Sequence, residues 1–561
     1  MRYTIIRLSC LLLLLLSVPA HAASRAEKLA ASLTLEEKVG QVFMVWFAGP
    51  ELSEDVIRLI RDRHVGGLIL YSAAGNIASP EQVARLTASI QATAAASPHL
   101  PGLLIGIDQE GGPVARLRQG VTLFPSQMAQ AATCRTDLVR QAAAISGREL
   151  AACGINVNFA PVADVNINPA NPIIGIRSFG SDPAEVARFT AAATDGYNTA
   201  GIICTPKHFP GHGDTAVDSH IGLPTVSHDA ATLTRVDWPP FRAAFAAGAP
   251  AVMTAHVLTP AFDADNLPAT LSPRMLQGVL RGRMGFQGVI FSDSLGMGAV
   301  VKRYGTAEAA VRTLVAGADV LLIGADKGRP ASERLEAMDR VIAAVRDGRL
   351  PLARLNEAVL RILRLKERYG LLDAARLANP NPNLPRLLAT AAHQAVARRI
   401  AARSLTAFRL DKGLLPLTAP QETLVVRPQI GRAPLDPESE AALAAWPGVR
   451  TAFLPPAPDE ATIRAVAAQA AVAHTVIFLA TDVRRHPEQG ALAKALAAAK
   501  PDRLLVVAAE SPYDLALLPE APARLALYGE TPVGLAALER SLFGPFRFTG
   551  RCPAELDATK P

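Results

Sequence analysis

The chain has 561 residues, of which half are hydrophobic, 19% are charged and 5% are aromatic. This composition is typical of a folded globular protein and excludes a disordered or fibrous one, and the length favours more than one domain. The formal net charge of +7 is dispersed along the sequence, which argues against nucleic acid as a partner.

Residues 1–22 have the pattern of a signal peptide. Arg2 and Arg7 precede an apolar run at 11–16, and the sequence Ala-His-Ala at 20–22 provides the small residues of a cleavage site. The run is shorter than the roughly 20 apolar residues that span a bilayer. We therefore expect an exported protein, periplasmic or secreted, with no stable membrane anchor and with two fewer positive charges after cleavage.

Residues 23–375 are predicted to form one catalytic domain of alternating strands and helices. Eight apolar runs have the length of buried strands: 39–47, 66–71, 103–108, 155–160, 201–206, 250–256, 287–291 and 318–323. Amphipathic stretches separate these runs, as in repeated β-α units. The pattern predicts a (β/α)8 TIM-like barrel, whose active site lies at the carboxyl ends of the strands.

The end of the first domain is marked by helical patterns at 331–348 and 352–369, followed by the sequence Asn-Pro-Asn-Pro-Asn at 379–383. Alternating proline stops helices, so we assign 376–398 to a linker and entry helix, with the helix itself expected around 388–402. A second domain at 399–561 should follow.

The second domain is predicted to be a C-terminal α/β/α sandwich. Alanine-rich helical stretches alternate with strand-like runs at 423–427, 474–480, 503–508 and 524–528. Regular alternation of this kind is typical of packed α/β layers rather than of low-complexity sequence. The sequence leaves open whether this domain contributes to an active site or only supports the barrel.

Four cysteines follow the predicted cleavage site: Cys134, Cys153, Cys204 and Cys552. Their wide spacing matches neither a zinc site nor a dense disulfide framework, and the sequence leaves any pairing undetermined.

The densest group of chemically active side chains is KHFPGHGDTAVDSHIGLP at 207–224, directly after the fifth predicted strand. Its glycine and proline residues exclude a regular helix, so we expect a loop over the barrel mouth. Asp218 and His220 are two residues apart, and in an extended loop both side chains point the same way. A carboxylate beside an imidazole fixes its tautomer and stabilises its charged form, which makes His220 a candidate acid/base.

The same loop leaves two other interpretations open. Each histidine taken singly is more often a structural residue than a catalytic one. A metal site is also conceivable, since carboxylates and imidazoles are both acceptable ligands. The residues concerned are His208, His212, Asp214, Asp218 and His220. Their spacing is not that of a regular metal motif, so we expect neither a metal nor a cofactor.

A second motif, GVIFSDSLGMGAV, delivers Asp293 at the end of the seventh predicted strand and therefore at the catalytic face. Asp293 could instead cap a helix that is expected to begin near 297, and its position alone does not decide. Glycoside cleavage needs an anionic carboxylate below the anomeric carbon and a proton donor at the leaving oxygen. Asp293 and His220 are suited to these two roles.

Two further motifs follow the third and fourth predicted strands. GIDQEGGPVARL holds Asp108 and Arg116, and NFAPVADVNINPANPIIGIRSFG holds Asp164 and Arg177. Asp108 can accept hydrogen bonds from sugar hydroxyls, and Arg177 offers a forked set of donors. Each has a structural alternative, Asp108 as a cap for the glycines that follow it and Arg177 as half of a surface ion pair.

The motifs together resemble those of the family 3 glycoside hydrolases, and within that family the β-N-acetylglucosaminidases, also called β-hexosaminidases. DQEGG, NFAP with RSFG, KHFPGHG, DSH and FSD occur in the family's order across nearly the whole mature chain. The resemblance implies an exo-acting, retaining enzyme that hydrolyses terminal β-linked GlcNAc from muropeptides or related glycans through a covalent glycosyl-enzyme. It implies a role in peptidoglycan recycling, a carbohydrate as ligand, and a monomer.

The resemblance also implies the roles of individual residues. Asp293 is the nucleophile, His220 the acid/base and Asp218 its partner. The residues that the family uses to bind the sugar correspond here to Asp108, Arg116, Arg177, Lys207 and His208.

Three positions depart from the family's pattern. Pro113 stands where an arginine is usual after DQEGG, and Ser294 and Gly296 replace the usual aspartate and serine after the nucleophile. We expect these changes to alter substrate contacts or loop geometry rather than the chemistry. The alternatives are a β-glucosidase or other exo-glycosidase, a phosphorylase that uses phosphate in place of water, and a non-catalytic cell-wall binding protein.

Overall fold

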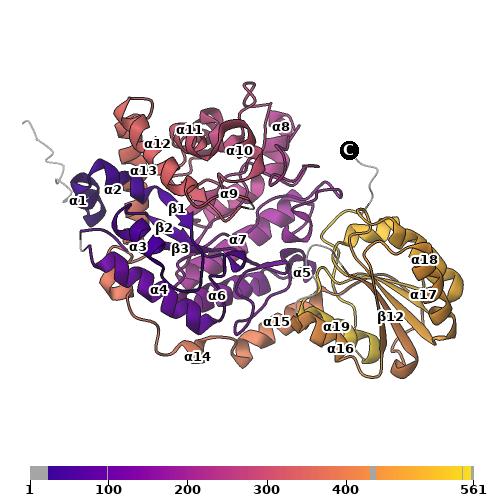
Figure 1. Cartoon of the computed structure of the whole chain (residues 1–561). Helices are drawn as coiled ribbons and strands as arrows, with labels where there is room; N and C mark the ends of the chain where they lie inside the picture. The colour runs from indigo at the N-terminus through magenta and orange to yellow at the C-terminus, as the bar shows by residue number, and fades with distance from the viewer. Residues whose placement is uncertain (1–22, 98, 327, 430–436, 546, 557–561) are drawn as a thin grey trace, which may run out of the picture.

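The structure is a computed structural model that describes residues 23–97, 99–326, 328–429, 437–545 and 547–556. The predicted signal peptide lies outside these ranges. Within them the chain folds into two domains that lie side by side, a barrel and a smaller sandwich (Figure 1). None of the described helices is both long enough and apolar enough to cross a lipid bilayer.

The first domain is a (β/α)8 barrel. Within the described residues its eight parallel strands are β1 (Phe43–Trp46), β2 (Gly67–Ile69), β3 (Leu104–Ile107), β6 (Val157–Asn158), β7 (Ile203–Cys204), β8 (Ala251–Met253), β9 (Val289–Phe291) and β10 (Leu321–Ile323). Six of them form one sheet in the order β10-β1-β2-β3-β6-β7, and β8 pairs with β9. Parallel bridges from Phe209 to Thr254 and from Phe291 to Val320 close the ring.

Helices surround the barrel, and short elements occupy its loops. They are α1 (Arg25–Ser32), α2 (Leu35–Gln41), α3 (Glu54–Arg61), α4 (Pro80–Ala95), α5 (Gln127–Ala132), α6 (Thr136–Ala152), α7 (Pro183–Ala200), α8 (Ala230–Thr232), α9 (Pro239–Ala246), α10 (Gly298–Tyr304), α11 (Thr306–Ala316), α12 (Glu333–Arg346) and α13 (Leu352–Arg368). A π-helical segment, Arg274–Arg283, lies between β8 and β9, and a hairpin of β4 (Gln109–Gly111) and β5 (Val114–Ala115) follows β3.

The first predicted strand begins later than its apolar pattern indicates. The run at 39–47 is helical as far as Gln41, because a reciprocal capping box between Thr34 and Glu37 starts α2. The helix continues through Gly40, where a Cβ atom would lie only 2.3 Å from the carbonyl oxygen of His64. The prediction was therefore wrong for the first residues of this run, and the seven other barrel strands fall within their predicted ranges.

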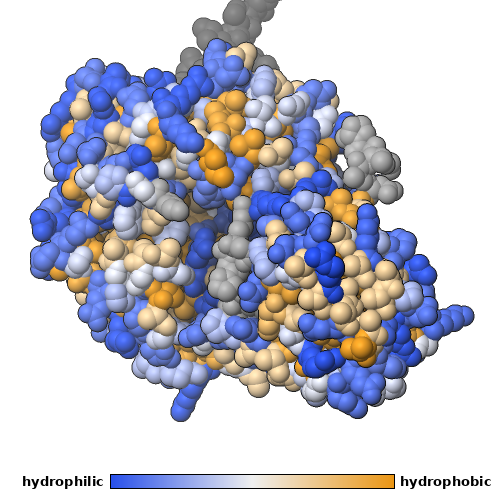
Figure 2. All heavy atoms as spheres, turned by 45° about the vertical axis from the view of Figure 1, so that its right-hand side comes forward, coloured by the Kyte–Doolittle hydropathy of each residue, from blue (hydrophilic) through white to orange (hydrophobic). Residues whose placement is uncertain are grey.

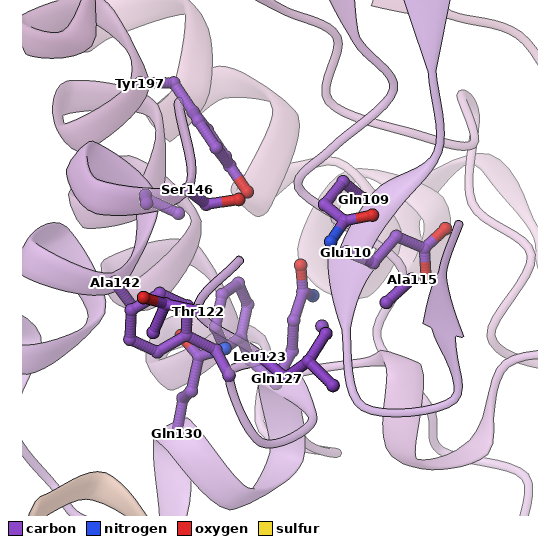
Figure 3. Close-up of a pocket in the computed structure, with 15 residues that line it drawn as sticks. Gln109, Glu110, Ala115, Thr122, Leu123, Gln127, Gln130, Ala142, Ser146 and Tyr197 are labelled. Carbon is purple, nitrogen blue, oxygen red and sulfur yellow. The ribbon is translucent and has the colours of Figure 1, made fainter. Parts of the chain in front are cut away.

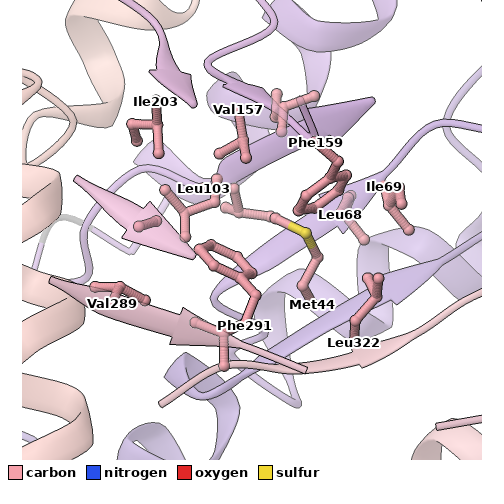
Figure 4. Close-up of a cluster of buried hydrophobic side chains, with 14 of the residues drawn as sticks. Met44, Leu68, Ile69, Leu103, Val157, Phe159, Ile203, Val289, Phe291 and Leu322 are labelled. Atoms are coloured by element: carbon pink, nitrogen blue, oxygen red, sulfur yellow. The ribbon is translucent and has the colours of Figure 1, made fainter. Parts of the chain in front are cut away.

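The barrel interior is filled by apolar side chains from all sides of the ring. Met44, Phe159 and Phe291 meet there, and the rings of Phe159 and Phe291 pack edge to face with centroids 5.7 Å apart (Figure 4). These side chains are fully buried. Because the interior is a packed core rather than a pore, the polar side chains that follow the strands must lie at its mouth.

The second domain is an α/β sandwich. Its sheet has the order β11-β16-β15-β14-β12-β13, and only β11 is antiparallel to its neighbour among the described strands. The strands are β11 (Thr406–Leu410), β12 (Thr423–Pro428), β13 (Arg450–Leu454), β14 (Thr475–Ala480), β15 (Leu504–Ala508) and β16 (Ala523–Ala526). Sequence analysis missed β11 and β13, which lie at the two edges.

Helices cover both faces of this sheet. They are α15 (Ala391–Ser404), α16 (Pro437–Ala444), α17 (Glu460–Val472), α18 (Glu488–Ala499) and α19 (Pro532–Phe543). The short helix α14 (Leu384–Leu387) precedes them and packs on the barrel, with Leu384 in the barrel's apolar core. Alternate residues of β14 belong to two separate apolar clusters: Ile477 packs with α15, α16 and α19, and Phe478 packs with α17 and α18. This alternation produces the three layers.

The two domains share a small apolar cluster and several hydrogen bonds. Met128 of α5 and Tyr528 belong to this cluster. The hydroxyl of Tyr513 donates to the carbonyl of Asn166 at 2.9 Å, and Ser126 donates to the carbonyl of Tyr528 at 2.6 Å. The surface is hollowed between the two domains, with hydrophilic residues around the hollow (Figure 2).

Candidate active site

Asp293 follows β9 and lies at the carboxyl end of the barrel. It does not cap the next helix, because α10 has Met297 at its N-cap position; its Oδ1 atom instead accepts the N–H of Ser294 at 2.7 Å. Burial raises the pKa of Asp293, but the imidazoles of His256 and His208 and the Ser294 N–H outweigh burial, so the pKa is lowered overall. The side chain is therefore an anionic carboxylate at neutral pH.

His220 and Asp218 form the pair that their spacing predicts. Nδ1 of His220 lies 2.8 Å from Oδ1 of Asp218, and the same oxygen accepts the His220 N–H at 2.9 Å. The hydrogen bond that His220 donates to Asp218 raises the pKa of His220 against the opposing effect of burial, and the charge of Asp293 adds to the increase. Among the described residues Nε2 of His220 has no hydrogen-bond partner, and Asp293 lies within electrostatic range of the ring.

The loop that carries this pair is held against the barrel by close backbone contacts. At Gly213 a Cβ atom would lie 1.8 Å from the carbonyl oxygen of Val165, so only glycine fits. Farther along, His212 pairs with the hydroxyl of Ser219 at 3.2 Å, and the N–H of Ala299 donates to the Ser219 carbonyl at 3.1 Å. These contacts bring Asp218 and His220 toward the end of β9.

A second histidine fixes the base of the same loop. His228 lies between two carboxylates, with Nε2 2.9 Å from Asp214 and Nδ1 2.7 Å from Asp237. Hydrogen bonds to Asp214 and then Asp237 raise the pKa of His228 to about 10. His228 is thus a cation that joins the loop to Asp237. Among the described residues no cluster of three or more histidine, cysteine, aspartate or glutamate side chains has a metal-binding arrangement.

The predicted sugar-binding cations share one buried carboxylate, Glu110. Lys207 lies 2.8 Å from Asp108 and 2.7 Å from Glu110, and Arg177 donates to both oxygens of Glu110 at 2.9 and 2.8 Å. The side chains of Lys207 and Glu110 are 3% and 1% exposed, so this is a buried network and not the surface pair considered for Arg177. Burial opposes ionisation of Glu110, but the two cations hold its pKa well below the usual range.

His208 is oriented by Asp164. Nδ1 of His208 lies 2.7 Å from one oxygen of Asp164, and the other oxygen accepts the backbone N–H groups of His208 and His212 at 3.2 and 2.7 Å. Asp164 is fully buried, and these partners lower its pKa despite burial. Nε2 of His208 then faces Arg177 at 3.5 Å, which brings the two side chains together.

Arg116 stands apart from this network. Its backbone N–H donates to the carbonyl of Asp108 at 3.3 Å, but its buried Nε atom has no hydrogen-bond partner in the described part of the chain. Burial and the negative charge of Asp108 raise the pKa of Tyr71, and the positive charge of Arg116 opposes that increase. The Nε–H donor of Arg116 is thus left unpaired within the described residues.

Sequence analysis missed three residues of this region. Glu110 stands in the DQEGG motif two positions after Asp108, so its alternation with Asp108 was a signal that could have identified it. Tyr71 and Asp326 follow β2 and β10 without any motif. Both interact electrostatically with Asp293, which places them at the same mouth of the barrel.

A small cavity separates Glu110 from α6 and α7. It has a volume of about 20 Å³ and is lined by polar side chains that include Gln109, Gln127 and Tyr197 (Figure 3). A cavity of this size and polarity has room for one water molecule. It lies beside the barrel wall and is distinct from the mouth where Asp293 lies.

Comparisons with known proteins agree with this geometry. The sequence model of the glycosyl hydrolase family 3 N-terminal domain matches residues 34–365. The chain is 36% identical to beta-hexosaminidase A of Pseudoalteromonas piscicida over 66% of this chain, a match that spans 62% of the relative's length. It is 34% identical to a beta-N-acetylglucosaminidase/beta-glucosidase of Cellulomonas fimi over 72% of this chain and 70% of the relative.

A solved structure supports the relationship over both domains. The family 3 beta-N-acetylglucosaminidase from a Paenibacillus species superposes with a TM-score of 0.86 at 39% sequence identity. The alignment covers 94% of this chain and 100% of that one. The two-domain arrangement is therefore shared.

Proposed function

The chain belongs to glycoside hydrolase family 3, and we propose that it is an exo-acting, retaining β-N-acetylglucosaminidase that hydrolyses terminal β-linked GlcNAc. The observation that carries the proposal is the placement of an ionised carboxylate, Asp293, within electrostatic range of an imidazole that Asp218 orients. These are the two groups that a double displacement at an anomeric carbon requires.

In the first half of the reaction, Asp293 attacks the anomeric carbon. Its lowered pKa keeps it anionic, and the N–H of Ser294 fixes one oxygen so that the other is free to attack. Protonated His220 donates its Nε2 proton to the leaving oxygen. Asp218 stabilises the imidazolium before transfer, which explains the raised pKa.

In the second half, neutral His220 removes a proton from water, which attacks the glycosyl-enzyme from the opposite side to the Asp293 oxygen. Two displacements at one carbon restore the original configuration. Asp218 again stabilises the imidazolium that forms. One pair thus serves as acid and then as base.

The sugar is proposed to lie against Asp108, Lys207, Arg177 and His208, with Arg116 at the Asp108 side. The buried bonds to Glu110 hold the two cations in fixed positions. Their remaining N–H donors, together with the acceptor oxygens of Asp108, match neutral hydroxyl groups. We propose that the ring bound here is a terminal one, which is the exo-acting specificity stated above.

The natural substrate class is proposed to be GlcNAc-containing cell-wall fragments, consistent with an exported monomer that takes part in peptidoglycan recycling. The signal peptide pattern at 1–22 supports export. Sequencing the amino terminus of the mature protein tests this, and a mature chain that begins at Met1 in the cytoplasmic fraction would contradict it.

A panel of aryl β-glycosides tests the activity. We expect faster turnover of the N-acetylglucosaminide than of the glucoside, with β-GlcNAc as the first product seen by NMR. Faster turnover of the glucoside would favour a β-glucosidase, and sugar binding without turnover of either would favour a binding protein. A sugar 1-phosphate formed when phosphate is added would identify a phosphorylase.

A further inference from the structure

A second carboxylate lies beside the proposed nucleophile. Asp326 follows β10, the barrel neighbour of β9, and its Oδ2 atom accepts the hydroxyl of Ser294 at 2.5 Å. Ser294 Oγ itself accepts the N–H of Gly324 at 2.8 Å, so its own proton is directed to Asp326. One residue, Ser294, thus connects Asp293 through the backbone and Asp326 through the side chain.

Gly296 provides the room for this carboxylate. A Cβ atom at Gly296 would lie 2.3 Å from Oδ2 of Asp326, closer than any real contact. Ser294 and Gly296 are the two positions after the nucleophile that depart from the family's pattern. Both departures allow the Asp326 carboxylate to occupy its observed position. Ser294 donates a hydrogen bond to the carboxylate, and Gly296 has no Cβ atom to clash with it.

The Asp326 carboxylate has a second oxygen, Oδ1, besides the one that accepts the Ser294 hydroxyl. Within the part of the chain that the structure describes, its Oδ1 atom has no hydrogen-bond partner, and the residue is half-buried. Burial and then the negative charge of Asp293 raise the pKa of Asp326, and the imidazole of His220 acts in the opposite direction. The carboxylate is therefore within electrostatic range of both the proposed nucleophile and the proposed acid.

We propose that Asp326 is a specificity-determining residue that accepts a hydrogen bond from the donor on C2 of the sugar, which is the N–H of the 2-acetamido group. The proposal rests on the proposed function. Asp293 attacks C1, and the C2 substituent is bonded to the adjacent atom, so it lies beside the nucleophile. Ser294 bonds to both carboxylates, through its backbone N–H to Asp293 and through its hydroxyl to Asp326, so Asp326 lies on the same side of the barrel mouth as that substituent.

The test compares substrates with and without a donor on C2. For Asp326→Ala, kcat/KM for an aryl β-N-acetylglucosaminide should fall by about 10-fold to 100-fold, the range for losing a hydrogen bond to a charged group. The value for the matching aryl 2-deoxyglucoside should stay close to wild type. Equal losses on both substrates, or no loss on either, would overturn the proposal.

Gly296→Ser provides a second variant that leaves Asp326 in the chain. The added Cβ displaces the Asp326 carboxylate, so the same preference for the 2-deoxy substrate should appear, and adding Asp326→Ala should lower kcat/KM no further. Additive losses would contradict the inference. If the wild-type enzyme fails to cleave the N-acetylglucosaminide at all, the proposed function is wrong, which is a different result from a variant that fails to discriminate.

Discussion

The Oδ1 atom of Asp218 accepts both the Nδ1 proton and the backbone N–H of His220, at 2.8 and 2.9 Å. One oxygen therefore fixes the position of the residue and the tautomer of its ring. The imidazole side chain is 57% exposed, so this hydrogen bond and not packing determines its orientation. The pH dependence of the enzyme should reflect the bond directly.

Asp218→Asn should move the alkaline limb of the kcat/KM profile to lower pH. The carboxylate raises the pKa of His220, and the first half-reaction needs the protonated ring, so a lower pKa means that the acid is lost at lower pH. A full pH profile with an aryl N-acetylglucosaminide measures the shift. An alkaline limb that stays in place would argue against His220 as the group that titrates.

His220→Ala should lower kcat/KM more for substrates with poor leaving groups than for substrates with good ones. Removing the acid should lower kcat/KM by about 10²-fold to 10⁴-fold when the leaving group is a poor one, the usual contribution of general acid catalysis. The leaving group of a dinitrophenyl glycoside needs little protonation, so the rate of the first step should fall far less for this substrate. Burst kinetics separate that step from slow hydrolysis of the intermediate, and equal losses for both leaving groups would contradict the acid role.

Asp293→Ala should abolish turnover while binding persists. Loss of the proposed nucleophile should reduce kcat on the order of 10⁴-fold or more, because the groups that remain are proposed only to bind and protonate the substrate. Titration with GlcNAc, followed by intrinsic fluorescence, checks that the subsite is intact. Substantial residual turnover with retention of configuration would show that another group attacks.

Glu110→Gln should destabilise the barrel, since it leaves Lys207 and Arg177 buried without their shared anion. Breaking a buried ion pair costs about 3 to 5 kcal/mol, measured here by denaturant unfolding. The folded pKa of Glu110 is lowered, so its contribution is present above its unfolded pKa, about 4.3, and is lost as pH falls below that value. As the pH is lowered, the free energy of unfolding should therefore fall less for the variant than for the wild-type protein. An equal fall in both proteins would contradict this account.

Gly213→Ala tests the position of the catalytic loop. A Cβ atom 1.8 Å from the Val165 carbonyl must push the loop outward, and a displacement of about 1 Å at the acid/base can cost about 10²-fold in kcat. Gly222→Ala in the same loop is the matched control, because its Cβ would meet only a side-chain atom of Val217 at 3.2 Å. Equal activity in both variants would show that the Gly213 contact does not set the loop position.

The barrel and most of the second sheet could be predicted from sequence because their strands are buried runs of apolar residues. The missed strands lack that signal: β11 is mostly exposed beyond Thr406, and β13 is exposed or half-buried before Leu454. Edge strands contact one neighbour only, so an apolar pattern is not required of them. The start of β1 was misplaced because Val39 is as apolar as the strand that follows.

The candidate site was predictable where motifs carry it and not elsewhere. Asp293, His220 and Asp218 stand in motifs whose spacing already indicates chemistry. Asp326 stands in no such motif. Its proposed role depends on the hydrogen bond that it accepts from Ser294, and these two residues follow different strands that become neighbours only in the folded barrel. Glu110 was overlooked although its alternation with Asp108 was visible.

The network around Glu110 also determines how the subsite responds to salt. Lys207 and Arg177 are balanced by Asp108 and Glu110 in contact with them, so the four groups together are electrically neutral. Ions in solution have little net field to screen there. Affinity for an uncharged sugar should thus be nearly independent of ionic strength, so the same amount of substrate should be bound in dilute buffer and in concentrated salt.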